Sequence, residues 1–68
     1  MTKKEIGEAI LAQAKLHLRQ NGYSMDNFPE DYPISRRSLY EIGNGRWTEA
    51  ILKKLPFKVV VSYSVSFV

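Results

Sequence analysis

Two arginines and a tyrosine stand close together near the middle of this 68-residue chain, in the run ISRRSLYEIGNG. Such side chains donate hydrogen bonds to phosphates and base edges, and arginine can form a two-point contact with guanine. Leu39 and Ile42, three residues apart, would share the buried side of a helix. Arg36, Arg37 and Tyr40 have no apolar role and would point elsewhere. These residue types and spacings suit a short helix that enters a groove of a nucleic acid.

The same run carries signals for both ends of that helix. Ser35 is a good N-cap, because its hydroxyl can accept a hydrogen bond from a free N–H of the first turn. Ile34 and Leu39 have the spacing of a hydrophobic staple. Residues 43–45, Gly-Asn-Gly, should end the helix, since Gly and Asn tolerate the left-handed conformation. We therefore predict a helix over residues 35–43.

The run also resembles the third-helix segment of the Cro/C1-type helix-turn-helix repressors. Their pattern there is an aliphatic residue, a serine, a basic residue, some polar residues, an aliphatic residue, a glutamate and a glycine. Here the serine is Ser35, the inner aliphatic residues are Leu39 and Ile42, and the closing glycine is Gly45. Gly43 stands where the family has its glutamate.

The resemblance covers residues 34–55 and implies a small phage or plasmid repressor that binds double-stranded DNA as a homodimer. In such a protein Arg36 or Arg37 would contact a guanine edge, and basic residues nearby would contact phosphates. Lys3 and Lys4 are further phosphate candidates. The expected DNA-contacting residues are Ser35, Arg36, Arg37, Tyr40, Asn44, Arg46, Lys53 and Lys54.

The distribution of charge along the chain agrees with DNA contacts in residues 34–55. The net charge is +3 and the sequence pI is near 9.4, which is only mildly basic. Residues 34–55 carry five basic and two acidic side chains, whereas residues 23–33 carry three acidic ones and no basic one. The basic cluster is equally consistent with an ordinary solvated surface, and a solvated loop is the favoured interpretation of the acidic cluster. The acidic residues alternatively contact a basic partner, or Arg36 and Arg37.

Several functional classes have little support in the composition. The chain has no cysteine and one histidine, which leaves almost no material for thiolate metal sites or catalytic triads. A core this small leaves little room for a ligand pocket. No apolar run approaches the roughly 18 residues of a membrane span, and no signal-peptide pattern opens the chain. We expect a cytoplasmic protein that is not an enzyme, with no cofactor, metal, small-molecule substrate or membrane segment.

The first part of the chain should form one amphipathic helix over residues 3–21. Thr2 and Glu5 have the spacing of a capping box, and Asn21 and Gly22 form a C-cap signal. His17 falls within the apolar stripe and is expected to pack there. In residues 23–33 two prolines disfavour a full helix, although a regular helix-turn-helix has its second helix in this position. The aromatic and apolar residues of this segment that can anchor it on the core are Tyr23, Met25, Phe28 and Tyr32.

A third helix is predicted over residues 48–55. Thr48 is an N-cap candidate, Trp47 and Leu52 have the spacing of a staple, and Pro56 should stop the helix. Trp47 is expected in the core, with stacking on a base as the alternative. The fold class is therefore mainly α: a single small domain, residues 1–68, with three helices arranged like a helix-turn-helix.

The last segment, residues 57–67, alternates apolar and other residues with the period of a half-buried strand. No other segment resembles a partner strand, so we expect it to pair with the same strand of a second copy about a two-fold axis. The expected dimer-interface residues are Phe57, Val59, Val61, Tyr63, Val65 and Phe67. The alternative function is a small protein-binding module, an inhibitor or antitoxin-like adaptor that acts through this exposed strand.

Overall fold

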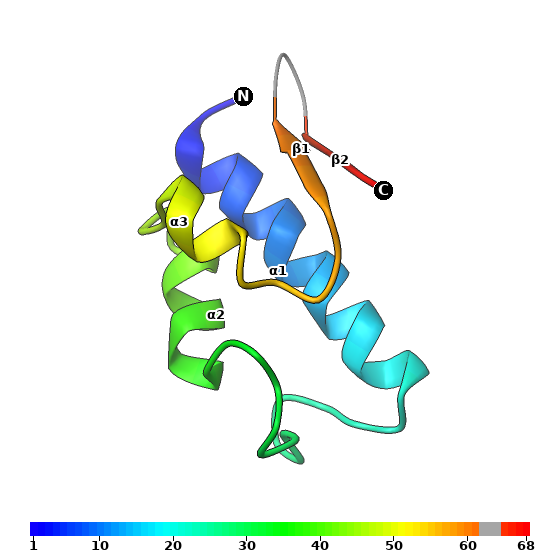
Figure 1. The fold of residues 1–68 in the computed structure, drawn as a ribbon. Coiled ribbons are helices and arrows are strands. Elements are labelled where there is room, and N and C mark those ends of the chain that lie inside the picture. The colour runs from blue at the N-terminus through cyan, green and yellow to red at the C-terminus, as the bar shows by residue number, and fades with distance from the viewer. Residues whose placement is uncertain (62–64) are drawn as a thin grey trace.

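The structure is a computed structural model that describes residues 1–61 and 65–68. The described residues form three helices followed by a two-stranded antiparallel sheet (Figure 1). The elements are α1 (Lys3–Gln20), α2 (Arg36–Gly43), α3 (Glu49–Leu52), β1 (Val59–Val61) and β2 (Val65–Phe67).

The predicted capping box opens α1. The Thr2 hydroxyl accepts a hydrogen bond from the backbone N–H of Glu5, and the Glu5 carboxylate accepts one from the backbone N–H of Thr2, both at 3.1 Å. The hydrogen bond from the Thr2 backbone, and then that from its hydroxyl, hold the pKa of Glu5 below its usual value. A lowered folded-state pKa means that this cap stabilises the helix above the usual pKa of glutamate and is lost as the pH falls.

The core lies between α1 and α2. Ile10 and Leu18 of α1 and Leu39 and Ile42 of α2 are fully buried. Ile34, the residue before the Ser35 cap, is buried in the same cluster as Leu39, so both ends of the predicted staple reach the core. The burial of Ile10 and Leu18 also confirms the apolar stripe predicted for the first helix.

Two glycines bring these helices close together. A Cβ atom at Gly7 would collide with the backbone carbonyl of Ile42, and a Cβ atom at Gly43 would collide with the side chain of Leu11. The backbones of α1 and α2 therefore approach where neither carries a side chain. This contact fixes the orientation of α2, which at eight residues is too short to be stable alone.

The predicted third helix is shorter than expected. Thr48 caps it, with its hydroxyl accepting from the N–H of Ile51 at 3.4 Å, but regular helix ends at Leu52. The N–H groups of Lys54 and Leu55 donate to carbonyls three residues back, so the last turn tightens before Pro56. The predicted extent to residue 55 is therefore wrong, whereas the start is confirmed.

Residues 23–33 form bends and turns without a helix, as their prolines indicated. Met25, Phe28 and Tyr32 pack against the core, but Tyr23 is 41% exposed, so its expected role as an anchor is wrong. Tyr32 lies near His17, with its hydroxyl 3.4 Å from Nδ1, and burial raises the pKa of Tyr32. His17 packs there as expected.

The expected single strand over residues 57–67 is wrong. The described part of this segment forms a hairpin in which Val59 pairs with Phe67 and Val61 pairs with Val65. The register joins odd-numbered residues to odd-numbered residues. One face of the hairpin therefore collects the same alternating apolar side chains that a single long strand would present. The strand thus has a partner within the chain, and pairing between copies would have to use an outer edge of the hairpin.

Four of the six expected interface residues contribute to the core of their own chain. Phe57, Val59, Val65 and Phe67 are half-buried and pack against the core cluster. Val61 is 40% exposed. Tyr63 lies outside the described residues.

Helices α1 and α2 end in the same way, with an asparagine followed by a glycine of positive φ: 82° at Gly22 and 83° at Gly45. The N–H one residue beyond each glycine donates back into the last turn, from Tyr23 to Leu18 at 2.8 Å and from Arg46 to Glu41 at 2.9 Å. These are Schellman motifs, and they confirm the predicted stop signals.

Replacing Gly45 or Gly22 with alanine should destabilise the fold by about 1–2 kcal/mol, because an L-residue is strained at such a φ. The loss at Gly45 should be larger. An added Cβ there would lie 3.1 Å from the Lys4 Cα, whereas nothing lies within 4 Å at Gly22. Urea denaturation of both variants measures the difference. Equal losses would contradict the close packing of Lys4 on Gly45.

Candidate nucleic-acid interface

Helix α2 has one buried side and one exposed side. Leu39, Ile42 and Gly43 are buried against α1. Arg37, Tyr40 and Asn44 follow one another at spacings of three and four residues, which places them along the exposed side. Tyr40 is 46% exposed, and Arg37 and Asn44 are exposed as well. The structure therefore brings three of the predicted DNA-contacting residues into one stripe, which we call the α2 stripe.

Arg36 lies on the flank of the α2 stripe and has a structural partner. Its guanidinium donates a hydrogen bond of 2.9 Å to the backbone carbonyl of Met25. This bond ties Arg36 to the segment before α2, a role that the sequence did not indicate. The residue is still exposed, and a guanidinium carries further donors.

Ser35 serves mainly as a helix cap. Its hydroxyl accepts a hydrogen bond from the N–H of Ser38 at 3.2 Å and donates to the Ser38 hydroxyl at 2.9 Å. The predicted N-cap is confirmed. The hydroxyl proton is already used within the chain, so a contact from Ser35 to DNA would have to replace that bond.

An ion pair lies at the C-terminal end of α2. Arg46 donates to the carboxylate of Glu41 at 3.1 Å, and the two side chains are 74% and 35% exposed. Among the described residues this is the one ion pair, so the acidic residues of 23–33 do not form one with Arg36 or Arg37. Glu41 is the acidic residue of α2, and Arg46 offsets its charge beside the α2 stripe.

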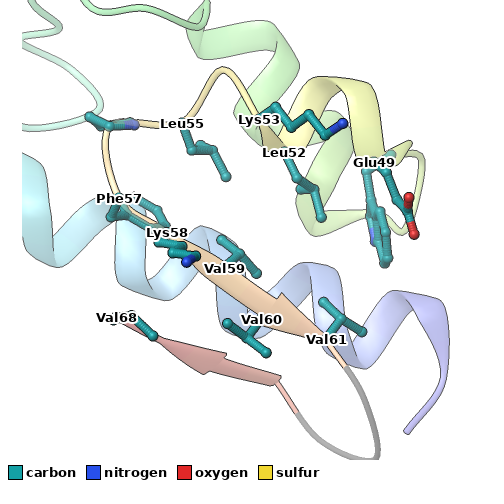
Figure 2. A pocket seen from close by; sticks show the side chains of 12 residues that line it. Glu49, Leu52, Lys53, Leu55, Phe57, Lys58, Val59, Val60, Val61 and Val68 are labelled. Carbon is teal, nitrogen blue, oxygen red and sulfur yellow. The ribbon is translucent and has the colours of Figure 1, made fainter.

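The remaining two predicted DNA-contacting residues lie away from α2. Lys53 and Lys54 follow α3, and Lys53 borders a groove between α3 and β1 (Figure 2). In Figure 2 the side chains of Leu52 and Leu55 point from α3 and the chain after it toward β1. The groove has a volume of about 860 Å³ and a mainly apolar lining. This space lies beside the core and opens to solvent.

The charges at the start of α2 oppose the usual preference of helices. Arg36 and Arg37 occupy its first two positions, and its first turn has no acidic residue. Helix α1 also begins with two cations, Lys3 and Lys4, but its first turn includes Glu5, and the first turn of α3 includes Glu49. Positive side chains are unfavourable at a helix N-terminus, where the helix dipole is positive. The two arginines are therefore placed where they lower the stability of α2.

The contact between Trp47 and Lys3, near the C-terminal end of α2, was not predicted from the sequence. The indole N–H of Trp47 donates to the backbone carbonyl of Lys3 at 2.9 Å, and the Lys3 ammonium lies 5.1 Å from the centroid of the indole ring. Trp47 is half-buried and packs against the core, as expected. The two residues are 44 positions apart, so no local pattern could have indicated that they meet.

The described residues contain no group of three or more metal-ligating side chains placed to hold a metal ion. Within the same part of the chain, no helix has both the length and the apolar character needed to cross a membrane.

Comparisons of this chain with protein-family models, with curated proteins and with solved structures found no match in any of the three. The chain's own residues are therefore the basis for any proposed function.

Replacing Arg37 with glutamate should raise the free energy of unfolding by about 0.3–1 kcal/mol, because a negative charge is favourable in the first turn of α2. The same exchange at Arg19, in the last turn of α1, should lower it. Urea denaturation at low salt measures both, and both effects should shrink at high salt. Loss of stability in Arg37→Glu would show instead that Arg37 makes a contact on which the fold depends.

Proposed function

We propose that this chain binds double-stranded DNA in the major groove through the α2 stripe and acts as a small homodimeric transcriptional repressor. The observation that supports this most directly is the division of α2 into a buried apolar side and an exposed side. The exposed side carries Arg37, Tyr40 and Asn44. A helix that reads bases directly presents polar side chains of this kind to the groove.

The rigidity of α2 supports the same function. Ser35 caps its start, the Asn44–Gly45 motif closes its end, and Gly7 and Gly43 hold it against α1. A helix that reads bases must keep its side chains in a fixed register, because a small displacement breaks two-point hydrogen bonds.

DNA binding would also explain why two arginines stand at the start of α2, where they are unfavourable for the helix. Local rules of stability are commonly violated at functional sites. Arg36 and Arg37 lower the stability of α2 in the free protein, but they place positive charge where DNA phosphates and guanine edges would supply partners.

In this proposal the contacts divide by position. Arg37 and Tyr40, at the centre of the α2 stripe, contact base edges. Arg36, held on the flank by Met25, contacts a phosphate. Asn44 lies at the end of the stripe, and Arg46, Lys53 and Lys54 contact phosphates farther out. In this proposal α2 takes the place of the recognition helix of a helix-turn-helix, and residues 23–33 take the place of the helix that precedes it. Access to DNA agrees with the cytoplasmic location expected from the sequence.

The homodimer remains part of the proposal, with pairing through an edge of the hairpin in place of a lone strand. A two-stranded sheet leaves one side of each strand without a partner in that sheet. Val60 and Val61 of β1 are 39% and 40% exposed. A two-fold axis through this edge would give two copies of α2 for two half-sites. Pairing of the same edge with a different protein is the alternative.

Replacing Arg37 with alanine should weaken binding to a preferred duplex by about 1–3 kcal/mol, roughly 5- to 150-fold, and relax the preference at one base position. Tyr40→Ala should weaken binding as well. Arg36→Ala should lower affinity uniformly across sequences, with a salt slope smaller by about one unit. A duplex selected from a random library and titrated by fluorescence anisotropy provides the measurement.

The matched control is Lys15→Ala, which removes the same charge from an exposed position of α1. It should leave affinity for the preferred duplex nearly unchanged, and circular dichroism should show all variants folded. No binding of the unaltered protein to duplex DNA at low salt would contradict the proposed function. So would equal losses in Arg37→Ala and Lys15→Ala.

Replacing Val61 with lysine should convert a dimer to a monomer, because it places a charge at the exposed hairpin edge. The fold should persist, since surface substitutions usually change stability by within about 0.5 kcal/mol. Sedimentation equilibrium measures the mass of both proteins. A monomeric unaltered protein at high micromolar concentration would contradict dimerisation through this edge.

A further inference from the structure

The first turn of α1 is attached to the segment that follows α2. The indole N–H of Trp47 holds the Lys3 carbonyl at 2.9 Å. Gly45 lies so close to Lys4 that an added Cβ would be 3.1 Å from the Lys4 Cα and 3.2 Å from its backbone nitrogen. Figure 1 shows this turn of α1 near α3 and the turn that leads to it. Residues far apart in the sequence therefore meet at the C-terminal end of α2.

This meeting point is rich in cations. Lys3, Lys4 and Arg46 are all exposed there. Two acidic residues near it have partners within the chain: Glu5 accepts from Thr2, and Glu41 accepts from Arg46. We call Lys3, Lys4 and Arg46 the C-end cluster.

The C-end cluster lies at the opposite end of α2 from Arg36 and Arg37. Eight helical residues span about 12 Å at 1.5 Å per residue. The major groove of B-DNA is also about 12 Å wide, with a phosphate strand along each edge. Cations at the two ends of α2 are therefore spaced to reach phosphates on both sides of the groove that α2 would enter.

We propose that Lys3 and Lys4 form a phosphate-binding site for DNA, which α1 contributes beside the C-terminal end of α2. This inference depends on the proposed DNA binding and adds a contact that anchors the end of α2 remote from its arginines. Lys3 has a double role: in the free protein its ammonium lies over the Trp47 ring, and in the complex it moves to a phosphate oxygen. Trp47 is the one tryptophan in the sequence, so its fluorescence reports directly on this site.

The test uses Lys3→Gln and Lys4→Gln, with Lys15→Gln as the matched control on another part of α1. Each variant is titrated with the preferred duplex and with an unrelated duplex across a salt series. Removing one phosphate contact should lower the salt slope by about one unit and weaken binding to both duplexes by the same factor. Lys15→Gln should leave the slope unchanged. In the unaltered protein, Trp47 fluorescence should change on binding, and in Lys3→Gln that change should be largely absent.

The outcomes separate this inference from the proposed function. If the unaltered protein binds DNA, loss of affinity in Arg37→Ala together with unchanged salt slopes in Lys3→Gln and Lys4→Gln would overturn the lysine site alone. A slope that falls equally in Lys15→Gln would overturn it too, because the effect would then reflect total charge. If the unaltered protein binds no duplex at low salt, both proposals fail. A duplex-dependent loss in Lys4→Gln would show a base contact instead of a phosphate contact.

Discussion

The close contact between α1 and α2 is the constraint on which the rest of the structure depends. Gly7 allows the backbone of Ile42 to lie against α1, and Gly43 leaves room for Leu11. A helix as short as α2 would not persist in isolation, so its position and direction come from this contact. The same contact turns one side of α2 into the core and leaves the other side exposed. It also brings the C-terminal end of α2 to the first turn of α1.

Local signals predicted the helices well, because caps and apolar spacing act over a few residues. The helix predicted over residues 35–43 has the N-cap and the closing glycine that the sequence indicated. The hairpin was missed for a physical reason: its register pairs Val59 with Phe67, so folding the segment back preserves the alternation of one long strand. The bond from Arg36 to the Met25 carbonyl joins distant segments, and no local pattern specifies it.

The exposed surface of α2 differs in character from the groove between α3 and β1. The groove is mainly apolar, whereas the α2 stripe is polar and is flanked by cations at both ends. The arginines at the start of α2 oppose its dipole, and packing of Leu39 and Ile42 against α1 stabilises the helix in spite of them. Polyanion binding would relieve that unfavourable arrangement. Under the proposed function, a phosphate-bearing partner would account for a placement that folding alone would not favour.

The most direct test of DNA binding by α2 is a titration of the ¹⁵N-labelled protein with duplex DNA, followed by NMR. The largest amide shifts are expected in residues 36–46, with a second group at residues 3–4. Amides near Lys15 and along the hairpin should change little in a complex of constant oligomeric state. Shifts concentrated at residues 52–61, or no shifts at low salt, would contradict DNA binding by α2.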